Sequence, residues 1–148
     1  MQPDFMLYDE NNNLVLVGEV RATKNQDQDW AAKLRRNLVA HGFLPAAPFF
    51  LLVSPEFVYL WKDAFSTEQV NPHFVSDTTS LLKPYLSRYD GDTSRLSESG
   101  LELAVHAWLN DIVSRTSRNG PLPGEDWLTQ SGLATRVRQG SLRYGDTP

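Results

Sequence analysis

The chain has 148 residues, 18 acidic and 14 basic, and a formal net charge of −4. This length predicts a single domain. The composition, 41% hydrophobic and 22% charged, is that of a globular protein and excludes a wholly disordered or fibrous chain. No apolar run is long enough to span a bilayer, so no transmembrane helix is expected. The absence of cysteine excludes disulfides and thiolate metal sites.

The acidic balance argues against a protein that binds nucleic acid through bulk positive charge, although it permits a local basic face. The first residues carry no basic patch followed by an apolar stretch, so no secretory signal is expected. These features predict a cytoplasmic protein that does not associate with membranes.

The chain begins with a predicted β-hairpin. Residues 5–8 indicate a short strand, and residues 14–22 indicate a longer strand rich in β-branched side chains. The Asp- and Asn-rich segment 9–13 favours a turn, because these residues bond their own backbone and tolerate left-handed angles. Pairing Tyr8 with Leu14 across this turn places Asp4 opposite roughly position 18.

A helix and two buried strands are predicted next. Asn25 or Asp27 can cap a helix that runs to about His41, because apolar residues recur there every four positions. Residues 48–53 form a continuous apolar run, which is typical of a buried strand, and residues 57–61 predict a strand that pairs back on it.

The second half is predicted to be mostly loop and helix. The expected elements are a loop at 63–76, a helical patch at 81–86 interrupted by Pro84, a polar linker at 87–97, a helix at 99–115 opened by a Ser99–Glu102 capping box, a break at 119–124, and a helical turn around 127–128. This order of elements indicates an α/β layer fold. We expect a domain over residues 1–118 and a tail over 119–148 that packs on it or extends from it.

Two acidic residues of the hairpin predict a metal site. Alternation along the second strand places Val15, Val17, Glu19 and Arg21 on one side. The hairpin pairing brings Asp4 close to Glu19. Two carboxylates without sulfur or histidine suit Mg²⁺ or Mn²⁺ rather than zinc. Such a metal activates water and offsets charge on a phosphodiester.

At these positions the chain resembles the PD-(D/E)XK nuclease superfamily, which has a restriction-endonuclease-like core with a mixed sheet flanked by helices. The resemblance rests on Pro3-Asp4 and on Glu19-Val20-Arg21, and it covers about the first sixty residues. It implies Mg²⁺- or Mn²⁺-dependent cleavage of DNA. It also implies that Asp4 and Glu19 are metal ligands, with the Val20 carbonyl as a third.

Two departures from the family pattern stand out. The lysine of the motif falls at Arg21, and arginine keeps the charge but does not release a proton. Lys24 is a substitute if the chain bends after Ala22. Members also have a helix and a strand before the Pro-Asp strand. The layer that this helix and strand would occupy is vacant at the start of the chain. Either the helix at 99–115 fills it, another chain supplies it, or a preceding segment is missing.

Each candidate residue also has a structural interpretation. Glu19 is then an edge-strand residue paired with Arg21 or Lys24, and Asp4 ends a strand. The basic residues of the first helix (Lys33, Arg35 and Arg36) are a solvated helix face or contact phosphates. The arginines near the C-terminal end (Arg136, Arg138 and Arg143) form a mobile basic tail or bind nucleic acid.

Three functional hypotheses follow. The first is a metal-dependent DNA endonuclease with Asp4 and Glu19 on the metal and with Arg21 or Lys24 as the catalytic cation. The second is an inactive nuclease-fold subunit that serves protein interaction or DNA recognition. The third is an assembly domain, a homodimer or a complex with a partner chain, joined through the exposed edge of the first strand.

Overall fold

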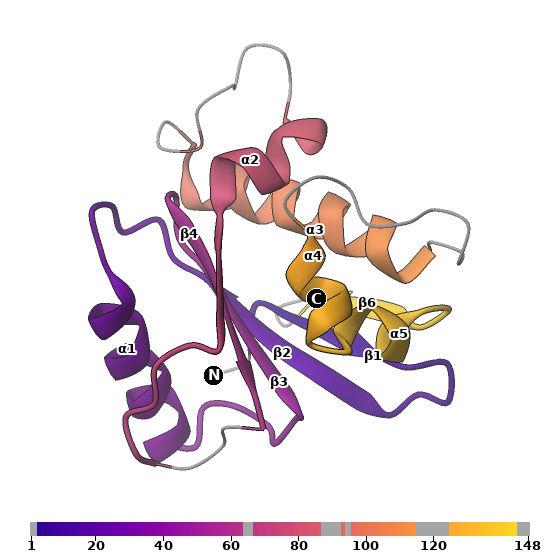
Figure 1. Ribbon diagram of the computed structural model, residues 1–148, viewed down its shortest axis with the longest axis horizontal. Helices are drawn as coiled ribbons and strands as arrows, with labels where there is room; N and C mark the ends of the chain where they lie inside the picture. Colours follow the sequence, from indigo (N-terminus) through magenta and orange to yellow (C-terminus); the bar gives the residue numbers. More distant parts are fainter. Residues whose placement is uncertain (1–2, 64–66, 87–92, 94–95, 115–124, 145–148) are drawn as a thin grey trace.

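The computed structural model describes residues 3–63, 67–86, 93, 96–114 and 125–144. It contains a six-stranded mixed sheet with the strand order β5-β4-β3-β2-β1-β6 (Figure 1). The strands are β1 (Phe5–Tyr8), β2 (Leu14–Val20), β3 (Phe49–Val53), β4 (Phe57–Lys62), β5 (Phe74–Asp77) and β6 (Ser141–Tyr144). Of these six strands, only β2 and β3 pair in parallel, and the other neighbours are antiparallel.

Helices cover both faces of the sheet, with α1 on one face and the remaining helices on the other (Figure 1). The helices are α1 (Gln28–Ala40), α2 (Thr78–Leu82), the 3-10 helix η1 (Lys83–Tyr85), α3 (Glu98–Ser114), α4 (Asp126–Gln130) and α5 (Leu133–Val137). Within the described ranges, no helix has both the length and the apolar character needed to cross a bilayer. The expected α/β class is confirmed by this arrangement of sheet and helices.

The two faces of the sheet carry separate hydrophobic cores. The core beneath α1 contains Val17, Phe50 and Trp61 together with Ala31 and Leu38 of the helix. The opposite and larger core is formed by side chains of α2, α3, α4 and α5 against the sheet. Each face buries apolar rows on β2 and β3, which explains why these central strands read as almost continuous hydrophobic runs.

The hairpin of β1 and β2 has the predicted pairing at its turn and a different register beyond it. Tyr8 pairs with Leu14 as expected, but a bulge between Leu7 and Tyr8 shifts the register, so that Phe5 pairs with Gly18. One step further, this register places Asp4 opposite Glu19 rather than opposite position 18. A β-bulge inserts one extra residue on one strand and so moves every later pair by one position.

The outer edge of β1 is covered by the chain's own C-terminal strand. β6 pairs antiparallel with β1, with Phe5 opposite Tyr144 and Tyr8 opposite Ser141. The expectation of an exposed edge at the first strand is therefore wrong, and β5 and β6 are the edge strands of the sheet. The helix α3, one of the three expected ways of filling the vacant layer, packs on the face of the sheet opposite α1.

The C-terminal arginines are also held against the body of the protein. The guanidinium of Arg143 lies 4.2 Å from the centre of the Tyr8 ring and donates to Asn12 at 2.7 Å. The guanidinium of Arg136 lies 5.8 Å from the centre of the Phe49 ring. The expectation of a mobile basic tail is wrong for these two residues, because each rests on an aromatic face of the N-terminal half.

Two further elements differ from the sequence expectations. The segment expected to be loop at 63–76 enters a strand at Phe74, and α2 then begins directly after Asp77, whose side chain accepts from the Ser80 N–H at 2.8 Å. The helix α3 begins at Glu98, and the Ser97 hydroxyl accepts from the Gly100 N–H at 3.0 Å, so the cap is Ser97 rather than Ser99.

Arg35 departs most from its expected place on a solvated helix face. Its side chain is completely buried beneath α1, and its Nη2 donates to the Glu68 carbonyl at 2.7 Å. Burial lowers the pKa of this guanidinium. The contact anchors the segment that leads into β5 against the helix, which is a structural role. The neighbouring Lys33 is exposed and pairs with Asp29 at 2.9 Å.

Candidate functional site

The candidate site lies where β1 begins and β2 ends, on the face of the sheet that α1 covers. The backbone fixes the Asp4 carboxylate: the Asp4 N–H donates to the Gly18 carbonyl at 3.0 Å, and the Val20 N–H donates to Asp4 Oδ2 at 2.8 Å. Strand alternation directs Glu19 to the same face as Val17, beneath the helix. The hairpin therefore brings the two predicted acids together.

Arg21 places a cationic nitrogen among the three oxygen groups that the resemblance assigns to a metal. Its Nη1 donates to Glu19 Oε2 at 2.7 Å and to the Val20 carbonyl at 3.2 Å. The same nitrogen lies 3.7 Å from Asp4 Oδ2. The Arg21 N–H, in turn, donates to the Val53 carbonyl at 2.9 Å, which keeps this residue aligned with β3 beyond the end of β2.

The site is closed on one side and open on the other. Only 2% of the Glu19 side chain is exposed, compared with 20% for Asp4 and 24% for Arg21. Burial and the neighbouring Asp4 carboxylate raise the pKa of Glu19 to about 7, although Arg21 opposes this shift. Glu19 therefore changes its charge near neutral pH. The partial exposure of Asp4 and Arg21 leaves the cluster open to solvent on their side.

Lys24 is not brought into the cluster. It is exposed, and it forms no ion pair with a carboxylate among the residues that the structure covers. The next residue, Asn25, adopts a left-handed backbone with φ of 61° and donates its N–H to Glu56 at 3.0 Å, which turns the chain toward β4. Arg21 is thus the cation that the fold places beside Asp4 and Glu19.

The donor chemistry fits a hard divalent ion. Two carboxylates and one backbone carbonyl are oxygen ligands of the kind that Mg²⁺ and Mn²⁺ prefer. They surround one point, which the Arg21 nitrogen now occupies. In the described part of the chain, no group of three or more His, Cys, Asp and Glu side chains is arranged to hold a metal. A metal here would therefore depend on the Val20 carbonyl and on water for its remaining ligands.

His106 is a neighbour that the sequence did not connect with the site. It lies on α3, its ring centre is 4.0 Å from that of Tyr144, and burial lowers its pKa while the Asp4 carboxylate opposes this effect. Its side chain is half-buried. Nothing in the local pattern of α3 indicates that the helix crosses near the start of β1.

Comparison of the chain with protein-family models, with curated proteins and with solved structures gave no match.

Proposed function

We propose that this protein is a metal-dependent nuclease of restriction-endonuclease-like fold that hydrolyses DNA phosphodiester bonds. The observation that carries the proposal is the convergence of Asp4 Oδ2, Glu19 Oε2 and the Val20 carbonyl around a single cationic position. These are the groups that the PD-(D/E)XK resemblance requires as ligands, and they come from two different strands.

The arrangement of the elements also supports the proposal. The hairpin of β1 and β2 is followed by α1 and by β3, which runs parallel to β2. This is the order in which the resemblance expects the core elements after the Pro-Asp strand. The neighbouring strand that such a core needs beside β1 comes here from the C-terminal end, as β6.

In this proposal, Asp4, Glu19 and the Val20 carbonyl hold the metal, which supplies an activated water and offsets charge on the phosphodiester. Asp4 is already oriented for this role by the Val20 N–H. Glu19 binds the metal in its ionised form, so its raised pKa makes proton release part of metal binding. A metal at these oxygens would displace Arg21, whose guanidinium would then be available to a phosphate oxygen but would not exchange a proton as a lysine does.

One observation favours a second candidate function, an inactive nuclease-fold subunit for protein interaction or DNA recognition. Arg21 Nη1 fills the position between the three oxygen groups and neutralises the buried Glu19 at 2.7 Å. A guanidinium fixed in this position would exclude a metal and would offset part of the cost of burying the Glu19 charge without one. The two candidates therefore differ in whether Arg21 yields its place to a divalent ion.

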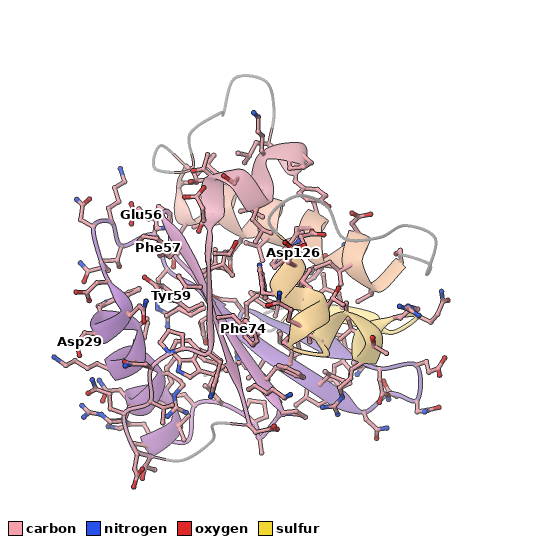
Figure 2. All side chains as sticks on the ribbon, in the orientation of Figure 1. Asp29, Glu56, Phe57, Tyr59, Phe74 and Asp126 are labelled. Atoms are coloured by element: carbon pink, nitrogen blue, oxygen red, sulfur yellow. The ribbon has the colours of Figure 1, made fainter. Side chains whose placement is uncertain are left out.

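Plasmid cleavage with Mg²⁺ and with Mn²⁺ separates the two functions. The wild type is expected to nick DNA, and Glu19→Ala is expected to lose this activity. The matched control is Asp29→Asn, which removes an exposed carboxylate on the outer side of α1 (Figure 2). Equal activity of the wild type and Glu19→Ala, or no activity in either, contradicts the proposed nuclease function.

A further inference from the structure

A small apolar pocket opens between the beginning of α1 and the β5 edge of the sheet. It encloses about 170 Å³ and is lined by Asp27, Gln28, Phe57, Tyr59 and Val75. Phe57 and Val75 are unusual for large apolar residues because 38% and 39% of their surfaces are exposed. The Phe57 and Tyr59 rings lie 6.0 Å apart between centres, at 47° to each other, on the α1 side of the sheet (Figure 2).

The pocket and the carboxylate site share one row across the sheet. Glu19 pairs with Leu52, Leu52 pairs with Tyr59, and Tyr59 pairs with Val75. Directly paired residues point to the same face, so Tyr59 stands on the face of Glu19, two strands away. Two strand spacings amount to about 10 Å. The backbone of Tyr59 therefore lies about two strand spacings from that of Glu19, with the buried Leu52 between them.

Polar groups at the pocket are suited to a heterocyclic ring. The buried Tyr59 hydroxyl has no hydrogen-bond partner within the described residues. The hydroxyl of Ser54 donates to the carbonyl and accepts from the N–H of Phe57, both at 3.1 Å. Burial and the carboxylates of Asp27 and Glu56 raise the pKa of Tyr59 to about 12, so its hydroxyl remains a donor. Asp27 supplies an acceptor: its Oδ1 accepts from the Trp30 N–H, and its second oxygen has no partner among the residues that the structure describes.

We propose that this pocket binds one unpaired nucleobase of the strand whose phosphate lies at Asp4 and Glu19. This inference rests on the proposed nuclease function, because the position of the phosphate defines where the base falls. Asp27 and Glu56 repel a phosphate at the pocket itself. The exposed Phe57 ring offers a stacking face, and bases stack on aromatic side chains without sequence preference. The pocket is also smaller than the roughly 300–1,000 Å³ typical of drug-sized ligands, so it holds one ring system.

The Asp27 acceptor and the Tyr59 donor add a preference among bases. Adenine and cytosine each present an amino group beside a ring nitrogen that accepts a hydrogen bond, whereas thymine has no exocyclic amino group. We therefore expect adenine and cytosine to bind better than thymine. Tyr59→Phe removes the donor with little change in shape and is expected to reduce this preference while leaving the stacking intact.

The test measures binding in EDTA, so that cleavage does not enter. The affinity of the protein for fluorescently labelled, single-stranded oligodeoxyadenylate is compared with its affinity for the same strand carrying abasic sites. The wild type is expected to bind the intact strand roughly fivefold to a hundredfold more tightly, which is the range for one stacked base. Phe57→Ala should abolish this difference. The control, Phe43→Ala, removes an equally exposed ring outside the pocket, 39% against 38%, and should preserve it.

Three results would overturn the pocket assignment: equal affinity for intact and abasic strands, equal losses in Phe57→Ala and Phe43→Ala, or binding of an arginine-containing peptide in place of DNA. The last result is included because acidic groups beside aromatic rings also suit a guanidinium. Glu19→Gln distinguishes the two proposals. If it retains base-dependent binding while no variant cleaves DNA, the pocket assignment stands and the nuclease function fails. Cleavage without base-dependent binding supports the nuclease function and overturns the pocket assignment.

Discussion

Arg21 donates from Nη1 to Glu19 Oε2 at 2.7 Å, directly beside the opening of the site to solvent. This contact pairs a buried carboxylate with a cation that is only partly buried. An isolated buried charge is costly unless a partner compensates it. The pair therefore offsets part of the cost of burying the Glu19 charge, and in the proposed function a divalent ion would take the position that Arg21 holds.

Arg21→Lys is expected to increase DNA cleavage, because it restores the lysine of the motif that the hairpin resembles. A lysine ammonium releases a proton more readily than a guanidinium and vacates the planar position between the carboxylates. We expect the initial rate of plasmid nicking in Mn²⁺ to rise by at least about tenfold. Lys24→Arg is the control, since Lys24 lies outside the cluster. A rate unchanged or lowered in Arg21→Lys would argue against a catalytic cation at this position.

The stability of the metal-free protein should depend on pH through Glu19. Its pKa is 4.5 in the unfolded reference and about 7 in the folded chain. The folded state holds the proton more tightly, so the free energy of unfolding falls as the pH rises from about 4.5 through 7. One pKa unit corresponds to about 1.4 kcal/mol, so this contribution amounts to roughly 2 kcal/mol between pH 5 and pH 8.

Urea unfolding in EDTA at several pH values measures this effect. Glu19→Gln is expected to gain about 2 kcal/mol relative to the wild type as the pH rises from 5 to 8. Glu10→Gln, which changes an exposed carboxyl in the hairpin turn, should follow the wild type. If the free energy of unfolding varied with pH in the same way in the wild type and in Glu19→Gln, Glu19 would have the same pKa in the folded and unfolded chain.

The hairpin that carries the site depends on a close approach at Gly18. A methyl group there would overlap the Phe5 ring, which packs over the glycine from the opposite strand. We expect Gly18→Ala to lower the free energy of unfolding by about 1–3 kcal/mol, the usual cost of overpacking. Phe5→Leu in the same chain should recover part of the loss.

Gly100→Ala is the matched control for Gly18→Ala. Gly100 lies in α3, where the nearest atom to an added methyl is 3.4 Å away and alanine is a better helix former. The control is expected to keep or slightly raise the stability, as measured by urea unfolding. If Gly18→Ala left the free energy of unfolding unchanged, the ring of Phe5 would have room to move away from β2.

The C-terminal segment is expected to be required for folding. Trp127 is 7% exposed, and its ring centre lies 6.0 Å from that of Trp108 in the larger core. Trp127→Ala should lower the free energy of unfolding by about 3–5 kcal/mol, as for other buried aromatic truncations. Thermal unfolding followed by circular dichroism measures this loss. A change of less than about 1 kcal/mol would place α4 outside the cooperative unit.

The sequence predicted the hairpin because its turn residues and β-branched runs are local signals. It predicted the pairing of Tyr8 with Leu14, but it missed the bulge beside Tyr8, because a bulge depends on the packing of both strands. The predicted register was wrong by one position beyond the bulge. The bulge aligns Asp4 with Glu19 more directly than the sequence led us to expect. The identities of the candidate residues came from the local motif, whereas their contact is a property of the register.

Long-range pairings were beyond sequence reasoning. β6 is four residues long and partly polar, and its partner β1 lies at the opposite end of the chain, so no periodic pattern indicates the pairing. The burial of Arg35 was missed for a similar reason, since only the segment near Glu68 makes a buried site for it. The pocket around Tyr59 joins α1 to two strands, and it too arises from the tertiary arrangement.

Calorimetric titration of the protein with Mn²⁺ tests the central claim most directly. We predict that the wild type and Asp29→Asn take up one Mn²⁺ per chain at millimolar metal or below, and that Glu19→Gln does not. Arg21→Ala should bind more tightly than the wild type, because no guanidinium competes for the three oxygen groups. Absence of uptake in both the wild type and Arg21→Ala, or equal uptake in Glu19→Gln, would contradict a metal site formed by Asp4, Glu19 and Val20.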